Sequence, residues 1–142
     1  MRKPGWQDGW YVVPWQVIFR DIDTFGHVNH AVYLSYFEWA RTSMWLALTG
    51  GSRATDIGFI VVRAECDFHH QIGLEPIEIR VRIGDMRGTS FDTHYEIRTR
   101  NGRQLAATGK VVVVLFDWEA QKKTRITDEF RRKVRLFQKE AE

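Results

Sequence analysis

The sequence contains a single cysteine, Cys66, and only three prolines among 142 residues. One cysteine cannot form an intramolecular disulfide, which indicates a reducing compartment. No apolar run reaches the length of a membrane span, and the polar start MRKPGWQDGW lacks the apolar core of a signal peptide. No internal repeat, low-complexity segment or Gly/Ser/Pro-rich linker divides the chain. We therefore expect one cytoplasmic domain over residues 1–142, without an integral membrane segment.

Neither sign of charge dominates the sequence. It contains 21 lysines and arginines and 18 aspartates and glutamates, for a net charge of +3. The basic residues gather at Arg98, Arg100 and Arg103 around one turn, and between residues 122 and 139. Such patches are most often simply solvated, although a basic rim also suits the phosphates of a coenzyme. The modest charge and the lack of an aromatic–basic repeat predict no nucleic-acid binding.

Aromatic residues are abundant, at 13% of the chain, and one long segment concentrates them. Residues 29–49 contain no glycine or proline and predict a helix of about five turns, ended by Gly50-Gly51. The segment is apolar almost all round, which predicts a helix surrounded by protein. Its narrow polar line consists of Ser35, Glu38 and Thr42. For Glu38 we expect a buried ion pair or hydrogen bond, with Arg41 as a candidate partner.

The rest of the chain is mostly typical of β-strands with a period of two. The expected strands span residues 10–19, 59–68, 77–83, 91–98 and 104–116. Asn101-Gly102 predicts a hairpin, and Thr127 is a suitable N-cap for a short last helix. One apolar helix among antiparallel strands indicates an α+β fold, with a sheet of about five strands curled around the helix. The exposed edges of such a sheet predict at least a dimer.

The connection between the first strand and the helix, residues 20–33, is the chemically dense part of the sequence. It contains two acids, two histidines and an asparagine. Free N–H groups at a helix N-terminus polarise a carbonyl and stabilise its oxyanion. A carboxylate beside that point can attack the carbonyl or remove a proton from water. The segment therefore favours acyl-transfer chemistry.

Three motifs resemble one family. They are Asp21-x-Asp23-x-x-Gly26-His27-Val28-Asn29-x-x-x-Tyr33, then Glu38-x-x-Arg41, and then the turn Met86-Arg87-Gly88-Thr89-Ser90-Phe91. In this order, over about residues 15–134, they are similar to hotdog-fold acyl-CoA thioesterases of the 4-hydroxybenzoyl-CoA thioesterase type. His30-Ala31 resembles the branch associated with the Tol-Pal system, and Gly26-His27-Val28-Asn29 resembles a branch that acts on long-chain acyl-CoA.

The resemblance implies a hotdog fold and hydrolysis of fatty or aryl acyl-CoA thioesters. Asp23 matches the catalytic aspartate, as nucleophile or general base, and the backbone N–H of His30 matches the group that polarises the thioester carbonyl. Residues expected to bind substrate are Gly26, His27, Val28, Asn29, Tyr33, Thr89 and Ser90. Arg63, Arg87 and the turn from Arg98 to Arg103 are candidates for the coenzyme A phosphates. No cofactor or metal is implied, and a homo-oligomer (a dimer or a tetramer, the family suggesting sites at subunit interfaces) is expected.

Alternatives stay open at this level. Asp23 could simply cap a turn, because aspartate often bonds its own backbone two residues on. An acyl-thioester hydratase would need a histidine paired with an acid, such as His27 with Asp23, and a non-catalytic acyl-CoA-binding protein would need neither. Asp21 is expected to be a structural acid paired with Arg20 or Arg41. Two further sets are read as structural: His69-His70 as a polar loop and Cys66 as a core residue.

Overall fold

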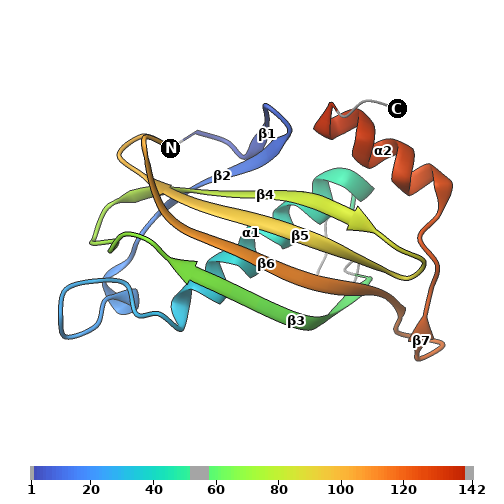
Figure 1. The fold of residues 1–142 in the computed structure, drawn as a ribbon, viewed down its shortest axis with the longest axis horizontal. Coiled ribbons are helices and arrows are strands. Elements are labelled where there is room, and N and C mark those ends of the chain that lie inside the picture. The colour runs from blue at the N-terminus through green and yellow to red at the C-terminus, as the bar shows by residue number, and fades with distance from the viewer. Residues whose placement is uncertain (1, 52–57, 140–142) are drawn as a thin grey trace.

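The computed structural model describes residues 2–51 and 58–139. Their strands are β1 (Gly5–Gln7), β2 (Trp10–Gln16), β3 (Phe59–Phe68), β4 (Pro76–Met86), β5 (Ser90–Thr99), β6 (Gln104–Asp117) and β7 (Lys122–Lys123). The helices are α1 (Val32–Thr49), α2 (Asp128–Gln138) and the short 3-10 helix η1 (Phe19–Asp21). Figure 1 shows α1 lying diagonally across one face of the sheet.

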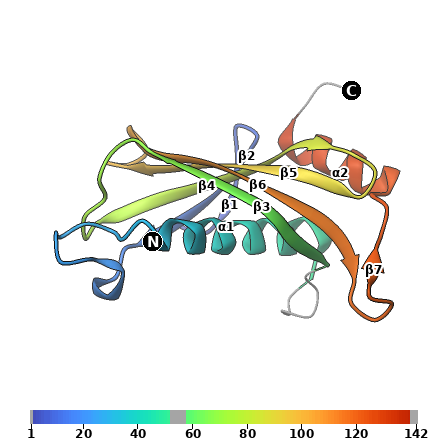
Figure 2. The same cartoon turned by 60° about the horizontal axis from the view of Figure 1, so that its bottom comes forward.

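The sheet is antiparallel, with the strand order β1-β2-β4-β5-β6-β3 and with β7 paired to the end of β6. Five long strands curl over α1, and Figure 2 shows the sheet on one side of the helix. α2 packs against the same core, where its Phe130 ring contacts Trp45 of α1 and Phe91 of β5. The expected α+β fold, a curled antiparallel sheet with one long central helix, is therefore confirmed. β1 and β3 form the two edges of the sheet.

The core lies between α1 and the concave face of the sheet. Alternate residues of each central strand point inward, as the period-two pattern predicted; on β4 these are Ile77, Ile79, Val81 and Ile83. Phe37 of α1 stacks on Tyr95 of β5, with ring centroids 4.3 Å apart. Gly109 of β6 makes this stacking possible, because a Cβ at that position would lie 2.2 Å from the Phe37 ring.

The helix ends where the sequence predicted but begins three residues later. Gly50 ends it in the left-handed conformation, with φ of +74°. At the start, the N-cap residue is Ala31, although Asn29, where the predicted helix begins, is of a residue type that commonly caps helices. The side chain of Asn29 instead accepts the Ala31 N–H at 2.9 Å, which forms a turn ahead of the helix.

One face of α1 is exposed, contrary to the expectation that protein surrounds it. Leu34 is 45% and Trp39 is 47% exposed, and Glu38 also faces solvent. The expected buried pairing of Glu38 is therefore wrong. Arg41 is the buried residue, and it donates a hydrogen bond to the Tyr95 hydroxyl at 2.9 Å. The reason is helical phase, since Arg41 shares the buried side of α1 with Phe37 while Glu38 lies on the opposite side.

The two ends of the chain carry elements that the sequence specified less clearly. β1 was not predicted, although Asp8 and Gly9, with φ of +51° and +82°, form the tight turn that joins it to β2. At the other end, Thr127 caps α2 by accepting the Phe130 N–H, as predicted. The side-chain amide of Gln138 then bonds both the N–H and the carbonyl of Ile83, which fixes α2 to the sheet. Within the described residues, neither helix combines the length and apolar character needed to cross a bilayer.

Candidate active site

The loop between η1 and α1 folds back on itself as a small hairpin. Ile22 and Val28 form an isolated antiparallel bridge. The Asp23 N–H donates to the His27 carbonyl at 2.9 Å, and the Gly26 N–H donates to the Asp23 carbonyl at 3.0 Å. Gly26 has φ of +83°, which residues with a side chain rarely adopt. The turn therefore requires glycine at this position.

The hairpin loop is attached to the body of the protein at its base. The Val28 N–H donates to the Ile72 carbonyl at 2.8 Å, and the Asn29 N–H donates to the Asp21 carbonyl at 3.0 Å. Val28 is also buried. These contacts fix the position of Asp23, two residues beyond Asp21, relative to the start of α1.

The Asp23 carboxylate is half-buried and uses one of its oxygens locally. Oδ1 accepts the Phe25 N–H at 2.9 Å, so the turn-capping interpretation of Asp23 is correct for this oxygen. Oδ2 has no hydrogen-bond partner among residues 2–51 and 58–139. One oxygen therefore orients the carboxylate, and the other is available to a proton or an electrophile.

His30 lies in the turn immediately before α1, not in the first helical turn as expected. Its carbonyl accepts the Tyr33 N–H at 3.4 Å, and its side chain is exposed. In the described part of the chain, the His30 N–H donates to no acceptor. The first turn of α1 also contains no acidic residue, so the partial positive charge of the helix N-terminus is not neutralised there.

Other predicted residues surround this loop. Tyr33 is buried, burial raises the pKa of its hydroxyl, and its ring makes an edge contact with Phe68, with centroids 4.8 Å apart. His27 is half-buried, and its Nδ1 is buried without a partner in the structure described. The Asp23 carboxylate accepts the Phe25 N–H and forms no hydrogen bond with the His27 imidazole in the described structure, so the histidine–acid pair that a hydratase requires is not formed.

Asp21 has a different partner from those expected. The Tyr36 hydroxyl donates to its Oδ2 at 2.9 Å, whereas neither Arg20 nor Arg41 is paired with it. A cavity of about 280 Å³ lies beside this bond, with Trp15 and Trp39 among its walls. The sequence did not predict this cavity. Trp15 and Trp39 are on different elements, and no periodicity within one segment brings them together.

Thr89 and Ser90 lie at the turn between β4 and β5, together with Arg87. The Arg87 guanidinium donates to the Ser90 hydroxyl at 2.9 Å and to the buried Asp92 carboxylate at 2.6 Å. The hydrogen bond from Arg87 lowers the pKa of Asp92. Arg87 is thus already paired with a carboxylate, which makes it a poor free ligand for phosphate.

Within a single chain, the predicted residues of the Asp23 loop lie far from the predicted residues Thr89 and Ser90. Tyr33 contacts Phe68, which pairs with Ala107 of β6, whereas Ser90 pairs with Val114. Ala107 and Val114 are seven residues apart on one strand, a span of about 23 Å. Figure 1 shows the loop before α1 and the β4–β5 turn at opposite ends of the molecule. Thr89 and Ser90, which the sequence predicts to bind substrate, therefore do not meet Asp23 within one chain.

The remaining candidates lie outside this loop. Arg63 is exposed in the middle of β3 and forms an ion pair with Glu65. Cys66 is half-buried against the core, and burial raises the pKa of its thiol to about 11. His69 and His70 follow β3 as exposed residues. Among the described residues, no group of three or more histidine, cysteine or acidic side chains is arranged to hold a metal.

Comparison with known proteins places the chain in a family. The model of the thioesterase-like superfamily matches residues 17–134. The uncharacterized protein YsmA of Bacillus subtilis is 31% identical over 114 residues, which cover 80% of this chain and 77% of that protein.

Solved structures share the fold. A thioesterase from Thermus thermophilus, complexed with coenzyme A and Zn, is 29% identical with a TM-score of 0.79, and the match covers 92% and 96% of the two chains. A 4-hydroxybenzoyl-CoA thioesterase complexed with 4-hydroxybenzoyl-CoA has a TM-score of 0.75 over 88% of this chain and 98% of that one. At 16% identity, the second likeness concerns the fold alone. With its central helix, its curled sheet and a family match over most of its length, this chain belongs to the thioesterase-like superfamily.

Proposed function

We propose that this protein hydrolyses the thioester of an acyl-coenzyme A, with a fatty or an aryl acyl group, to the free acid and coenzyme A. The proposal rests on two groups in the short loop between η1 and α1. It presents a carboxylate oxygen of Asp23 and the N–H of His30, neither of them bonded within the described structure. Membership of the thioesterase-like superfamily supports the same reaction.

The loop offers Asp23 two routes that end in the same products. In the first, Oδ2 takes a proton from water, the water oxygen bonds to the thioester carbon, and the carbonyl electrons move to an oxyanion. Collapse of that oxyanion breaks the C–S bond, and the leaving thiolate takes up the proton. In the second, the carboxylate itself bonds to the carbon, expels the thiolate and leaves a mixed anhydride that water hydrolyses. Neither route uses a cofactor.

The His30 N–H serves both routes. A backbone donor at the start of a helix stabilises the developing oxyanion, and loss of one such donor typically costs about 100- to 1,000-fold in rate. Because the N–H belongs to the backbone, the side chain at position 30 is free to vary.

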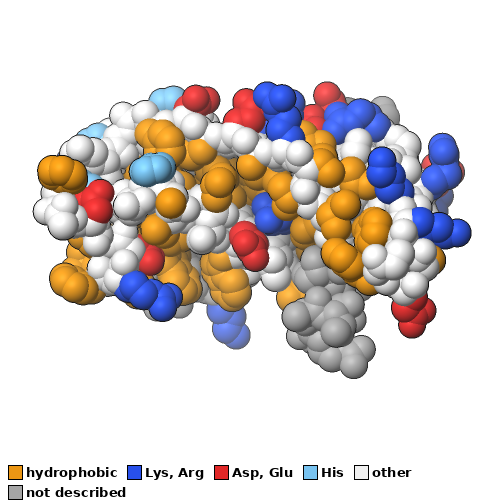
Figure 3. Space-filling model, turned by 90° about the horizontal axis from the view of Figure 1, so that it is seen from below, with side chains coloured by type: hydrophobic (Ala, Val, Ile, Leu, Met, Phe, Trp, Pro, Cys, Tyr) orange, Lys and Arg blue, Asp and Glu red, His pale blue; other side chains and the backbone are white. Residues whose placement is uncertain are grey.

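The distance within one chain between the Asp23 loop and the turn that carries Thr89 and Ser90 supports a dimer as the active form. β3 is an edge strand, and its exposed apolar residues include Val61, Val62 and Phe68. Figure 3, viewed from the side on which β3 lies in Figure 1, shows apolar side chains across the middle of this face. Antiparallel pairing of two β3 strands about a two-fold axis would place Phe68 of one chain opposite Phe59 of the other.

Such pairing would complete the site. It would bring the loop before α1 of one chain beside the partner's β4–β5 turn, so Asp23 would face Thr89 and Ser90 of the partner subunit. The exposed Leu34 and Trp39 on α1 remain available after this pairing, and they support association of two dimers into a homotetramer.

A complementation experiment tests the shared site. Asp23→Asn protein is mixed, under conditions that exchange subunits, with a Thr89→Trp/Ser90→Trp variant that blocks the turn. Mixed dimers would contain one intact site each, so roughly a quarter of wild-type activity should return. No recovery, with mixed dimers demonstrated by a tagged subunit, would contradict the shared site.

The substrate class is tested by thiol release from a panel of short-chain, long-chain, aryl and hydroxylated acyl-CoAs. We expect steady turnover of at least one class. A wild-type protein that releases thiol from none of them, while it binds coenzyme A, would instead be an acyl-CoA-binding protein.

A further inference from the structure

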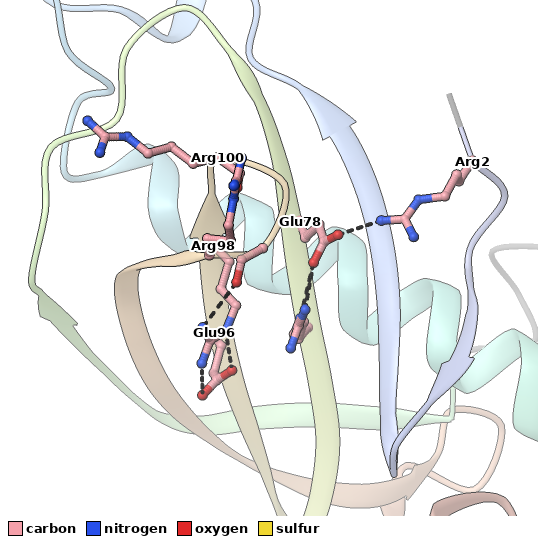
Figure 4. A network of polar contacts seen from close by, with 8 residues as sticks. Arg2, Glu78, Glu96, Arg98 and Arg100 are labelled. Carbon is pink, nitrogen blue, oxygen red and sulfur yellow. Dashed lines mark hydrogen bonds and ion pairs between the residues drawn. The ribbon is translucent and has the colours of Figure 1, made fainter.

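The end of the molecule that carries the β5–β6 hairpin has a strong positive charge. Five arginines gather there against two glutamates, an excess of three positive charges, as large as the net charge of the whole chain. The arginines are Arg2, Arg80, Arg98, Arg100 and Arg103, and Figure 4 shows Arg2, Arg98 and Arg100 together with Glu78 and Glu96.

The two glutamates are fully used by three of the arginines. Glu78 is only 7% exposed and accepts hydrogen bonds from Arg2 and Arg80. Glu96 accepts two hydrogen bonds from Arg98, whose remaining terminal nitrogen donates to the Gly102 carbonyl at 3.2 Å. These ion pairs leave no carboxylate in the cluster for the last two arginines.

Arg100 and Arg103 have no carboxylate partner among the described residues. Figure 4 shows Arg100 reaching away from the Glu78 pairs. Arg103 donates from Nε to the Arg100 carbonyl at 3.1 Å, which holds its guanidinium at the turn and leaves the terminal nitrogens available. Both side chains are exposed, so an incoming anion does not have to displace an existing pair.

These two arginines and Gln104 line a hollow of about 550 Å³, and no acidic side chain of the described residues lines it. The turn that supports it is held firmly. Arg100, Asn101 and Gly102 all have positive φ, and a Cβ at Gly102 would lie 3.0 Å from the Glu78 carboxylate. Glycine therefore lets the turn sit directly against the ion pairs, which fixes the backbone from which Arg100 and Arg103 project.

We propose that Arg100 and Arg103, at the β5–β6 hairpin, bind the phosphate groups of the coenzyme A portion of the substrate. The proposal rests on the acyl-CoA thioesterase function given above. Two planar guanidinium groups match the oxygen geometry of phosphate, and both line the same hollow. The β5–β6 hairpin and the Asp23 loop lie at the same end of the molecule in Figures 1 and 2. Arg63 and Arg87, by contrast, are each paired with a carboxylate.

The test measures binding and turnover separately. Binding of coenzyme A, and of pantetheine, which lacks the phosphates, is measured by calorimetry for wild type and for Arg100→Gln/Arg103→Gln. We expect the double variant to bind coenzyme A about tenfold more weakly at low salt. Its affinity for pantetheine should equal that of wild type. Arg100→Lys/Arg103→Lys, which keeps the charge but not the planar fork, should fall between the two.

Arg132→Gln, an exposed arginine on α2, is the matched control and should not change coenzyme A binding. Equal coenzyme A affinity in wild type and in the double glutamine variant would overturn the proposal, as would a loss caused by Arg132→Gln alone. The KM for an acyl-CoA separates this inference from the proposed function. Turnover with a KM that the double variant does not raise refutes only the phosphate site. Arginine-dependent binding without turnover refutes only the hydrolase.

Discussion

Tyr36 donates a hydrogen bond from its hydroxyl to Oδ2 of Asp21 at 2.9 Å, and this bond connects α1 to the base of the Asp23 loop. Burial, followed by the bond and the charge of Asp21, raises the pKa of Tyr36. The backbone carbonyl of Asp21 accepts the Asn29 N–H, so the same residue holds both strands of the loop. The position of Asp23 therefore depends on this pair.

Replacing Tyr36 with phenylalanine should loosen the loop. The change leaves the half-buried Asp21 carboxylate without its partner, and we expect a loss of about 1–2 kcal/mol in the free energy of unfolding, together with a lower kcat. Urea denaturation measures the first effect and thiol release the second. Tyr11→Phe, at a buried tyrosine of β2, is the control, since no hydrogen bond from its hydroxyl is found in the described structure. Equal losses in the two variants would contradict the account.

The Arg87–Asp92 pair should make stability depend on pH. Arg87 lowers the pKa of Asp92 in the folded protein, so the pair stabilises the fold above the unfolded value of 3.8 and loses this effect as the pH falls through the lower folded value. Arg87→Gln should therefore cost about 1 kcal/mol at pH 7, a figure reduced for the exposure of Arg87, and much less near pH 3. Urea unfolding at both pH values, with Arg132→Gln as the control, measures the difference. A cost that is the same at both would exclude the ion pair as its source.

Gly109 should be required for core packing. A Cβ there would lie 2.2 Å from the Phe37 ring, and Phe37 is itself stacked on Tyr95, so Gly109→Ala forces a core rearrangement. We expect a loss of about 1–3 kcal/mol or failure to fold. Gly5→Ala, with no atom within 4 Å, should change thermal stability little. Adding Phe37→Leu to Gly109→Ala should recover part of the loss, and a neutral Gly109→Ala would show that the ring moves freely.

Much of the fold could be predicted from local pattern. Strict alternation specified the central strands, and Gly50 and Asn101-Gly102 marked a helix end and a turn because these positions need positive φ. The start of α1 could not be predicted in this way. Asn29 is suited equally to capping a helix and to closing a turn, and its backbone bond to Asp21 decides for the turn.

The candidate site was only partly predictable, for a spatial reason. The motif found the Asp23 loop because its residues are adjacent in sequence. It could not reveal that Ser90 lies at the opposite end of the sheet, since strand register determines that separation. Nor could composition reveal which arginines are free. Arg87 and Arg100 look alike in sequence, and only the folded chain pairs the first with Asp92.

The role assigned to the His30 backbone can be separated from that of its side chain. His30→Ala retains the N–H and should keep most of the activity, whereas His30→Pro removes it and should lower kcat by about 100-fold or more. Circular dichroism checks that α1 still forms in the proline variant. Similar activities in the two variants would contradict oxyanion stabilisation by this N–H.

The most direct test of the central claim is the kcat for the best acyl-CoA substrate in wild type and in Asp23→Asn. Asparagine retains the size of the side chain and its Oδ1 acceptor for the Phe25 N–H, but cannot act as base or nucleophile. Asp8→Asn, in the exposed turn between β1 and β2 and outside the Asp23 loop, is the control and should match wild type. We predict a loss of at least about 100-fold for Asp23→Asn with the fold unchanged. A folded Asp23→Asn protein that retains wild-type kcat would show that Asp23 does not carry the chemistry.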